Sequence, residues 1–352
     1  MRRVRHTSGI LTLQETHTPT PGPGELLVRT EAIGVTLPVV RKLRPADSGT
    51  APQGAPQASP QASPQTASPA APQGAPQGAP QAATGEPIGG EVAGTVEAIG
   101  PDVTEYAPGD RVTGLCFGDA YAELALLHTS MASPVPAHAT AREAVALVRG
   151  GLVALGALET AGPRPGETAL ITAAAGGAGH LALQLARLHG GAGRVVAAVS
   201  DPAAKGAFLR DLGADAVLGY ADLEKADPAT ATGTATADAA DYALDAVGGD
   251  LLTPLVRTLA DGGRLVAYSS GGGTVDAYQL LLGGKSVAGF QIRRVASDQP
   301  QRYAAWREEL WRLHAEGALR PAVAAALPLD RAEEAHRLIR RRANLGKVLL
   351  IP

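Results

Sequence analysis

The second half of the chain alternates short apolar runs with longer amphipathic stretches. Residues 168–173 form an apolar run of the kind found in buried strands, and a helical pattern of leucines begins near His180. Helical spacing returns over 202–212 and 251–260. Strands that alternate with helices in this way predict an α/β fold with a doubly wound parallel sheet. The other strands of this sheet are predicted at 194–200, 214–220, 242–247, 264–270 and 286–292.

The first part of the chain has a different pattern, made of short strands and turns. Residues 25–31 alternate apolar and polar side chains as a strand does, and 108–114 reads as a turn that leads into a strand. The glycine-rich stretch 88–100 predicts a pair of strands. Strands at this spacing predict a small, partly open β-barrel. A helix follows over 140–158.

The last part of the chain predicts two helices and a final strand. An amphipathic helix is expected over 299–316, and a second helix ends near Arg342. Asp330 and Glu333 have the spacing of a capping box at the start of that second helix. The final strand, 347–351, is expected to pair with the N-terminal barrel.

Two stretches predict loops. Residues 45–87 repeat Ala-Pro-Gln-Gly and Ala-Ser-Pro-Gln units with almost no apolar side chain larger than alanine. Such a segment buries too little surface to offset its ordering entropy, so we expect a disordered insertion in a surface loop. A docking ligand for a partner protein is the alternative. The alanine- and threonine-rich stretch 227–239 is expected to be a flexible loop.

Composition narrows the class of protein. The chain has 352 residues, which is enough for about two domains, and its formal net charge is −3. A charge balance of this kind argues against a nucleic-acid surface. Cys116 is the single cysteine, which excludes an intramolecular disulfide and fits a reducing cytoplasm. The N-terminus lacks the apolar core of a signal peptide, and no uninterrupted apolar run reaches the ~18 residues of a membrane span.

The glycines at 176, 177 and 179 carry the strongest functional signal. They lie between a predicted strand and a predicted helix, and a second strand ends about 20 residues later, as in dinucleotide-binding folds. A tight turn lets the backbone approach a pyrophosphate, which then binds the free N–H groups and positive dipole at the helix N-terminus. A turn of small residues that merely packs a helix on a strand is the alternative.

At this point the chain resembles the medium-chain dehydrogenase/reductase superfamily, in its zinc-independent NADPH:quinone oxidoreductase branch. The resemblance covers nearly everything outside 45–87. It implies a GroES-like catalytic domain over 1–135, a Rossmann domain over 136–292, and a C-terminal return over 293–352 that completes the catalytic domain. The segments that carry it are Glu91-Val-Ala-Gly94, Pro108-Gly-Asp110-Arg-Val, Ala120-Tyr-Ala-Glu123, Ala173 with Gly176, Gly177 and Gly179, Leu212-Gly-Ala-Asp215, Asp245-Ala-Val-Gly-Gly249, Asp261-Gly-Gly-Arg-Leu265 and Gly346-Lys-Val-Leu.

The resemblance also implies a cofactor and its ligands. Ser200, Lys205 and Tyr220 match the family positions that surround the 2′-phosphate of NADPH, whereas Asp201 would favour NADH. Zinc is not expected, because the segment that carries a zinc-binding histidine in related alcohol dehydrogenases here reads Gly-Gly-Glu91. The candidate cofactor residues are Ala174, Gly176, Gly177, Ala178, Gly179, Ser200, Lys205, Tyr220, Val247, Ser269 and Arg342.

The implied activity is hydride transfer from NADPH to a quinone or an α,β-unsaturated carbonyl. Thr36, Arg41 and Tyr121 are the candidate catalytic residues, and Tyr121 is the candidate proton donor. Two alternatives stay open, and the second is motivated by the threonine and valines that replace polar family residues at 36, 39 and 153. One is a stand-alone enoyl reductase that acts on carrier- or CoA-bound thioesters. The other is a weakly catalytic nucleotide-binding interaction or sensor protein. The resemblance further suggests a homodimer joined through Rossmann edge strands.

Overall fold

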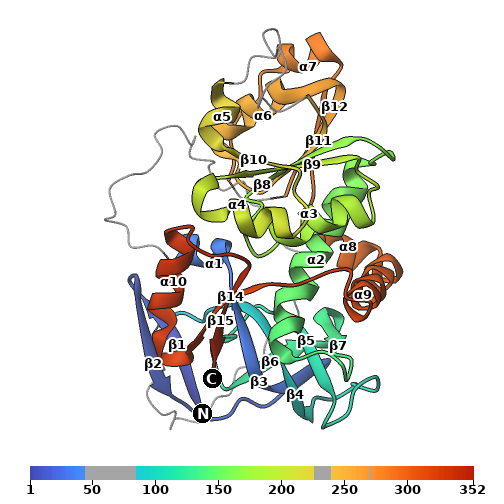
Figure 1. The fold of residues 1–352 in the computed structure, drawn as a ribbon. Helices are drawn as coiled ribbons and strands as arrows, with labels where there is room; N and C mark the ends of the chain where they lie inside the picture. The colour runs from blue at the N-terminus through green and yellow to red at the C-terminus, as the bar shows by residue number, and fades with distance from the viewer. Residues whose placement is uncertain (44–84, 226–238, 269–270) are drawn as a thin grey trace.

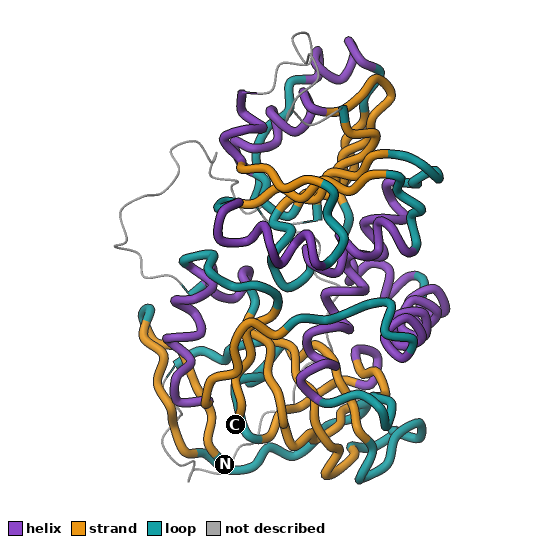
Figure 2. The backbone as a smooth tube through the Cα atoms, in the orientation of Figure 1, coloured by secondary structure: helices purple, strands orange, loops and turns teal. Residues whose placement is uncertain are grey.

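The computed structural model describes residues 1–43, 85–225, 239–268 and 271–352. Most of the predicted insertion and of the predicted 227–239 loop therefore lies outside the described residues. The chain forms two lobes, and the N- and C-termini both lie at the lobe that is rich in strands (Figure 1). Strands make up most of that lobe, whereas helices flank a sheet in the other (Figure 2). This arrangement is the predicted β-barrel domain and the predicted doubly wound domain.

The barrel lobe combines strands from both ends of the chain. The final strand, β15 (Lys347–Ile351), pairs antiparallel with the long strand β3 (Glu25–Val35) and parallel with β14 (Val323–Pro328). The sequence pattern did not predict β14. Pairing of the C-terminus with the N-terminal barrel is thus confirmed. The sheet order is β14-β15-β3-β4-β5-β7, with β6 also on β3 and a separate β1-β2 ribbon. These strands are β1 (Arg2–Thr7), β2 (Ile10–Glu15), β3 (Glu25–Val35), β4 (Gly90–Ile99), β5 (Arg111–Cys116), β6 (Leu124–His128), β7 (Ala132–Pro134), β14 (Val323–Pro328) and β15 (Lys347–Ile351).

The prediction of a strand pair over 88–100 is wrong, because β4 is one strand that pairs with β3 on one side and β5 on the other. The glycine inside this strand, Gly94, allows β4 to pack closely against β3 and does not form a turn. A Cβ on Gly94 would lie 1.9 Å from the carbonyl oxygen of Arg29 on β3. The register shifts at this point, between Thr30 and Ala32, as at a β-bulge. Glycine in a strand can therefore mark a close strand approach as well as a hairpin.

The second lobe holds a six-stranded parallel sheet in the order β10-β9-β8-β11-β12-β13. Alternate residues of β8 (Thr168–Thr172), one of the two central strands, contribute to two different cores. Ala169 and Ile171 pack with the helices α2 (Ala141–Ala161) and α3 (Gly179–Leu188), whereas Leu170 packs with α6 (Leu252–Thr258). Both faces of the sheet are covered, as a doubly wound sheet requires. The strands are β8 (Thr168–Thr172), β9 (Arg194–Val199), β10 (Ala216–Gly219), β11 (Ala240–Asp245), β12 (Leu259–Ala267) and β13 (Ser286–Gly289).

Several predicted boundaries shift in this lobe. Tyr220 begins α5 rather than ending a strand, and Ile292 begins α8 rather than ending β13. Short apolar runs do not distinguish a strand end from the first turn of a helix, which explains both errors. The helices here are α2 (Ala141–Ala161), α3 (Gly179–Leu188), α4 (Pro202–Asp211), α5 (Tyr220–Lys225), α6 (Leu252–Thr258), α7 (Ala277–Gly283), α8 (Ile292–Asp298) and α9 (Pro300–Ala315).

Helix α2 joins the two lobes. Thr140 and Glu143 form a reciprocal capping box at its start, which fixes where the helix begins. Its mean hydropathy of 1.5 makes it the one described helix long and apolar enough to cross a membrane, although charged residues interrupt its apolar run. Since 78% of that window is buried inside the protein, we interpret α2 as a core helix. Helices α8 and α9 pack on it, so the chain returns to the barrel only at β14.

Helix α10 (Ala332–Arg340) packs beside the short helix α1 (Leu37–Lys42), which the sequence pattern did not predict. The predicted capping box at its start is wrong. No side chain caps α10, because the short 3-10 turn Leu329–Arg331 precedes it and Glu333 pairs with Arg340 instead. Helices α1 and α10 thus come together from opposite ends of the chain, and both face the second lobe (Figure 1).

Candidate active site

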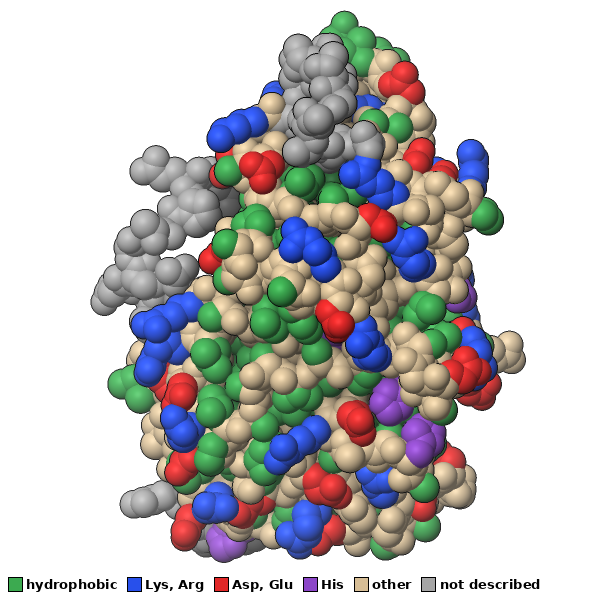
Figure 3. All heavy atoms as spheres, viewed as in Figure 1, with side chains coloured by type: hydrophobic (Ala, Val, Ile, Leu, Met, Phe, Trp, Pro, Cys, Tyr) green, Lys and Arg blue, Asp and Glu red, His purple; other side chains and the backbone are tan. Residues whose placement is uncertain are grey.

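A cavity of about 590 Å³ lies between the two lobes. Its floor is formed by residues that follow the carboxyl ends of β8, β9, β11, β12 and β13, which is where doubly wound sheets bind their ligands. Its other wall comes from α1, α2, α10 and the start of β15. On the face of the molecule in Figure 3, basic and acidic side chains are interspersed and no single-sign patch dominates. The cavity is therefore the feature that points to function.

The glycine turn after β8 lies at the centre of the cavity floor. Ala173 adopts a left-handed conformation with φ of 47°, and its carbonyl accepts the N–H of Gly176 at 2.8 Å. A Cβ on Gly179 would come within 2.2 Å of that carbonyl oxygen, so only glycine lets α3 begin this close to β8. In the described chain, the N–H groups of Gly177 and Ala178 donate to no backbone carbonyl. They provide an anion site at a helix N-terminus.

His180, in the first turn of α3, connects this turn to the C-terminal part of the chain. Its Nδ1 donates to the carbonyl of Gly176 at 2.8 Å, and its Nε2 accepts the N–H of Ala322 at 2.9 Å. The backbone partner on each side identifies the neutral tautomer. Burial lowers the pKa of His180 to about 4. The imidazole is thus neutral, and its two hydrogen bonds hold the glycine turn in place against the C-terminal part of the chain.

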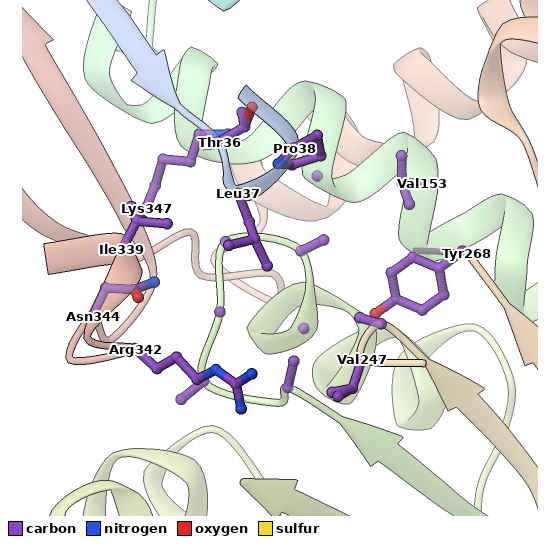
Figure 4. A pocket seen from close by; sticks show the side chains of 18 of the residues that line it. Thr36, Leu37, Pro38, Val153, Val247, Tyr268, Ile339, Arg342, Asn344 and Lys347 are labelled. Carbon is purple, nitrogen blue, oxygen red and sulfur yellow. The ribbon is translucent and has the colours of Figure 1, made fainter. Parts of the chain in front are cut away.

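Polar side chains from five segments of the chain meet at the β9 end of the cavity. Lys205 donates to the hydroxyl of Ser200 at 3.1 Å, and the hydroxyl of Tyr220 accepts the N–H of Ala173 at 3.2 Å. Arg342 reaches into the cavity from the turn after α10 (Figure 4), and Arg41 lines the same cavity from α1. We call these five residues the cationic cluster. Its members come from positions 41, 200, 205, 220 and 342 of the sequence.

The electrostatics of the cationic cluster favour an anion. Burial lowers the pKa of Lys205, and Arg342 lowers it further, whereas Asp201 acts in the opposite direction. Burial and the charge of Arg342 also lower the pKa of Arg41. Three cations that repel one another across a cavity gain most when a group with at least one negative charge binds between them. The cluster therefore has the chemistry of a phosphate site.

Asp201, the residue that would favour NADH, is already engaged. It is the N-cap of α4, and its carboxylate accepts the N–H of Ala204 at 3.0 Å. It does not line the cavity. Its side chain is therefore used to start a helix and not presented to a ribose.

Arg342 has a left-handed backbone, with φ of 53°. That conformation costs a non-glycine residue about 1 kcal/mol or more, and helices commonly place glycine there. The strained residue is also one whose side chain lines the cavity, and strained backbone of this kind is common at functional sites.

A buried ion cluster occupies the barrel wall of the cavity. Glu91 is 2% exposed, and its carboxylate pairs with Lys347 on one oxygen and with Arg149, at 2.9 Å, on the other. Burial raises the pKa of Glu91, but the two cations lower it by more, so the carboxyl stays ionised. Thr36 lies next to Lys347 (Figure 4). A Cβ on Gly34 would meet Lys347 at 2.8 Å, so this glycine makes room for the ion pair.

The structure brings most of the predicted site residues to one cavity, but not all. Ala174 is buried in the core and does not line the cavity, although Ala173 and Ala175 do, because the turn points its side chain inward. Ser269 lies outside the described residues. The predicted residues that line the cavity are Thr36, Arg41, Gly176, Gly177, Ala178, Gly179, Ser200, Lys205, Tyr220, Val247 and Arg342.

Tyr121 is not placed for catalysis, contrary to prediction. It is fully buried in the barrel core, where its hydroxyl and Nε2 of His336 are 3.1 Å apart. Burial raises its pKa far above the usual range, so it does not ionise. Arg41 differs in a smaller way, since it lies with the cationic cluster and not beside the ion cluster of the barrel wall.

Sequence reasoning missed Glu91, Arg149 and Lys347 as site residues. Glu91 and Lys347 stand in two segments that carry the resemblance, Glu91-Val-Ala-Gly94 and Gly346-Lys-Val-Leu, but nothing close to them in the sequence shows that their charges pair. Arg149 has a stronger signal, because it is the one charged residue between Glu143 and Glu159 of α2. In the described part of the chain, no three His, Cys, Asp or Glu side chains are grouped as a metal site would need. The absence of zinc stays a prediction.

Comparison with known families finds two matches. Residues 70–137 match the alcohol dehydrogenase GroES-like domain, and residues 212–350 match the zinc-binding dehydrogenase family. The chain is 31% identical over 266 residues to a probable quinone oxidoreductase of Schizosaccharomyces pombe. The aligned region covers 74% of this chain and 78% of that protein. It is 33% identical over 259 residues to a Streptomyces orinoci polyketide synthase protein, of which it spans only 12%.

Comparison with solved structures gives matches that cover the whole chain. A mycobacterial protein in complex with NADPH matches with a TM-score of 0.79 and 28% identity over the whole of both chains. A quinone oxidoreductase of Pseudomonas syringae matches with a TM-score of 0.77 and 26% identity, over 100% of this chain and 99% of that one.

Proposed function

This chain belongs to the medium-chain dehydrogenase/reductase superfamily, in its zinc-independent quinone oxidoreductase branch, and we propose that it reduces a quinone or an α,β-unsaturated carbonyl with NADPH. The observation that carries the cofactor choice is the cationic cluster. Lys205 and Arg342 repel one another across the cavity, and Asp201, which partly offsets this effect on Lys205, does not line the cavity. A 2′-phosphate satisfies this cluster, whereas the ribose hydroxyls of NADH would leave its charges unpaired.

The cavity accommodates a dinucleotide along the carboxyl ends of the strands. In this proposal, Ser200, Lys205, Tyr220, Arg342 and Arg41 bind the 2′-phosphate. The free N–H groups of Gly177 and Ala178 bind the pyrophosphate at the start of α3. The nicotinamide half then extends toward Val247 and Tyr268, which follow β11 and β12 (Figure 4). When bound, NADPH supplies a hydride to the acceptor.

The remaining contribution of the protein is positioning and charge. The apolar side chains of Leu37, Val153 and Phe290 also line the cavity. In this proposal they exclude water from the acceptor. The ion cluster of Glu91, Arg149 and Lys347 supplies fixed charges on the barrel wall. Preorganised charges in a cavity that excludes water are the main source of rate enhancement when no metal polarises the acceptor.

A second candidate activity has its own support. The similarity to a polyketide synthase protein favours reduction of an enoyl thioester carried on CoA or on a carrier protein. Both activities use the same hydride donor and differ in the acceptor. The acceptor panel therefore separates them.

The test is a fluorescence titration with NADPH and NADH, followed by turnover on a quinone, a simple enone and crotonyl-CoA. Lys205→Ala should weaken NADPH binding by about ten- to a hundredfold, because a charge-assisted hydrogen bond contributes ~1.5–3 kcal/mol, and should barely change NADH binding. Lys225→Ala is the matched control, since Lys225 is an exposed lysine outside the cavity.

The outcomes separate the candidates. Faster turnover on the quinone or the enone supports the main proposal, and faster turnover on crotonyl-CoA supports the thioester activity. Tighter binding of NADH than NADPH would overturn the cofactor choice. Cofactor binding with no turnover on any acceptor would instead support a nucleotide-binding sensor protein.

A further inference from the structure

A second cavity, of about 240 Å³, adjoins the first on its barrel side. Glu91, Arg149 and Gln291 line both cavities, so these three side chains form the boundary between them. A volume of this size is smaller than a typical site for a drug-sized ligand and suits a small ring or the end of an acyl chain. Most of its other lining residues are apolar or uncharged: Thr113, Gly114, Leu115, Phe117, Met131, Val145, Val148, Leu152, Ile292, Ala296 and Tyr303.

Arg149 is the unusual member of this boundary. It lies on α2, and about a third of its side-chain surface is accessible. In the described part of the chain, its guanidinium group has one hydrogen-bond partner, Glu91, at 2.9 Å. Its Nε is buried without a partner. A guanidinium group has five N–H donors, so Arg149 retains most of its hydrogen-bonding capacity.

The charges at the boundary do not balance. Glu91 is already neutralised by Lys347, which is 6% exposed and pairs with the other carboxylate oxygen. Arg149 adds a second cation to the same carboxylate and disfavours the charged form of Lys347. The ion cluster therefore carries a net charge of about +1 beside two cavities. Because Arg149 lines both cavities and keeps unused N–H donors, this place favours an anion.

Reduction of the acceptor creates such an anion. Addition of a hydride to the β-carbon of an enone forms a C–H bond there and breaks the C=C π bond. That electron pair moves toward the carbonyl, whose oxygen becomes an enolate oxyanion, while NADPH is oxidised to NADP⁺. A proton from water then adds to the α-carbon and restores the carbonyl. A quinone gives a hydroquinone anion in the same way. Either oxyanion needs a donor while it exists.

We propose that Arg149 is a catalytic residue that holds the acceptor oxygen, and that the second cavity holds the apolar part of the acceptor. This inference rests on the proposed reductase function and adds to it the group that stabilises the oxyanion. It also selects the acceptor: a small cyclic or short-chain carbonyl compound whose oxygen faces α2 while its apolar part enters the space beside Phe117 and Leu152.

The first test needs no turnover. 4-Nitrophenolate is a small coloured oxyanion, and its binding is measured by the visible absorbance of the anion, with and without NADP⁺ to occupy the cationic cluster. In wild type with NADP⁺, binding should increase the anionic fraction of added 4-nitrophenol. Arg149→Met should weaken phenolate binding by about ten- to a hundredfold, the range for a lost charge-assisted hydrogen bond. The phenolate affinity of Arg149→Lys should lie between those of wild type and Arg149→Met, since lysine keeps the charge but not the planar group of donors.

Two control variants sharpen the result. Arg142→Met removes an exposed arginine from the same helix that lines neither cavity, and it should bind phenolate as wild type does. Arg293→Met removes the other arginine of the second cavity, which stacks on Phe117 with 5.8 Å between its Cζ and the ring centroid. A larger loss in Arg293→Met than in Arg149→Met would overturn the inference. Thermal unfolding of every variant shows whether it is folded.

Kinetics give the second test. With the best acceptor, Arg149→Met should lower kcat by about 100- to 1000-fold, the usual effect of losing one oxyanion donor, with unchanged affinity for NADPH. A folded Arg149→Met protein with wild-type kcat and wild-type phenolate affinity would refute the role of Arg149. Failure of the proposed function itself looks different, because wild type would then fail to bind NADPH or to reduce any acceptor.

Discussion

His180 makes the stability of this protein depend on acidity in a calculable way. The imidazole is buried, donates to Gly176 and accepts from Ala322, so the native structure requires its neutral form. Burial lowers its pKa to about 4, from the ordinary value of 6.5. In the unfolded chain the ring regains the ordinary value. Below pH 6.5 the unfolded state therefore binds a proton that the native state does not.

The sign and size of the effect follow from this difference. Above pH 6.5 neither state binds the proton and the contribution to stability is complete. It is lost progressively as the pH falls toward 4, and its full size is about 3 kcal/mol, since one pKa unit corresponds to ~1.4 kcal/mol. Between about pH 7 and pH 5 the loss should be about 2 kcal/mol. Burial also lowers the pKa of His336 to about 4, so His336 adds a second loss in the same direction.

The assay is equilibrium urea unfolding at these two pH values. His180→Asn removes the titrating group, so its free energy of unfolding should fall by about 2 kcal/mol less than that of wild type between the two pH values. His17→Asn is the control, because His17 is exposed. A wild-type pH dependence in His180→Asn would refute the reasoning, since the imidazole would then not be held neutral in the native state.

Three further predictions concern the cofactor site and assembly. Asp201→Ala should lower the free energy of unfolding by about 1 kcal/mol through loss of the α4 cap, which urea unfolding measures. It should leave the ratio of NADPH affinity to NADH affinity unchanged in a nucleotide titration, whereas a selective loss of NADH binding would show that Asp201 contacts the ribose. Arg342→Gly should keep or raise the melting temperature, because glycine removes the left-handed strain, while NADPH binding weakens about tenfold or more in the same titration. We also propose a homodimer through the β13 edge of the parallel sheet, because Leu281 and Leu282 of the neighbouring helix α7 are 74% and 69% exposed. Leu281→Lys should shift the mass measured by light scattering toward that of the monomer, and an unchanged mass would exclude this interface.

The parts of the fold that depend on local patterns could be predicted from the sequence. The run 168–173 and the glycines after it predict a strand, a tight turn and a helix, and all three are present, because burial of alternate side chains and the steric demands of a turn act over a few residues. The helix at 299–316 is confirmed for the same reason, as α9. Where the pattern is short, it fails. Helix α1 has six residues and β14 is a run of alanines with valine and leucine, so neither stands out from its surroundings.

The site divides in the same way. Gly176 and Ser200 follow the two strands of one βαβ unit, and Lys205 lies in the helix that comes next, α4. Their spacing along the chain is enough to place them at one edge of a sheet. Tyr121 shows the limit of such reasoning. An aromatic hydroxyl near an expected cleft has the chemistry of a proton donor, but the packing of α10 against the barrel surrounds it with core side chains and His336. Whether a side chain faces a cavity or a core depends on the elements packed over it, and those elements are distant in the sequence.

The sequence by itself determined the class of fold, the dinucleotide turn and the family, because each depends on residues close together along the chain. Only the tertiary structure decided which charges meet. Glu91 and Lys347 are 256 positions apart and form one buried pair, and Arg149 joins them from a third element. Arg41 and Arg342 come from opposite ends of the chain to face Lys205. Electrostatic interactions act through space, so the charge balance of a site exists only once packing has brought its members together.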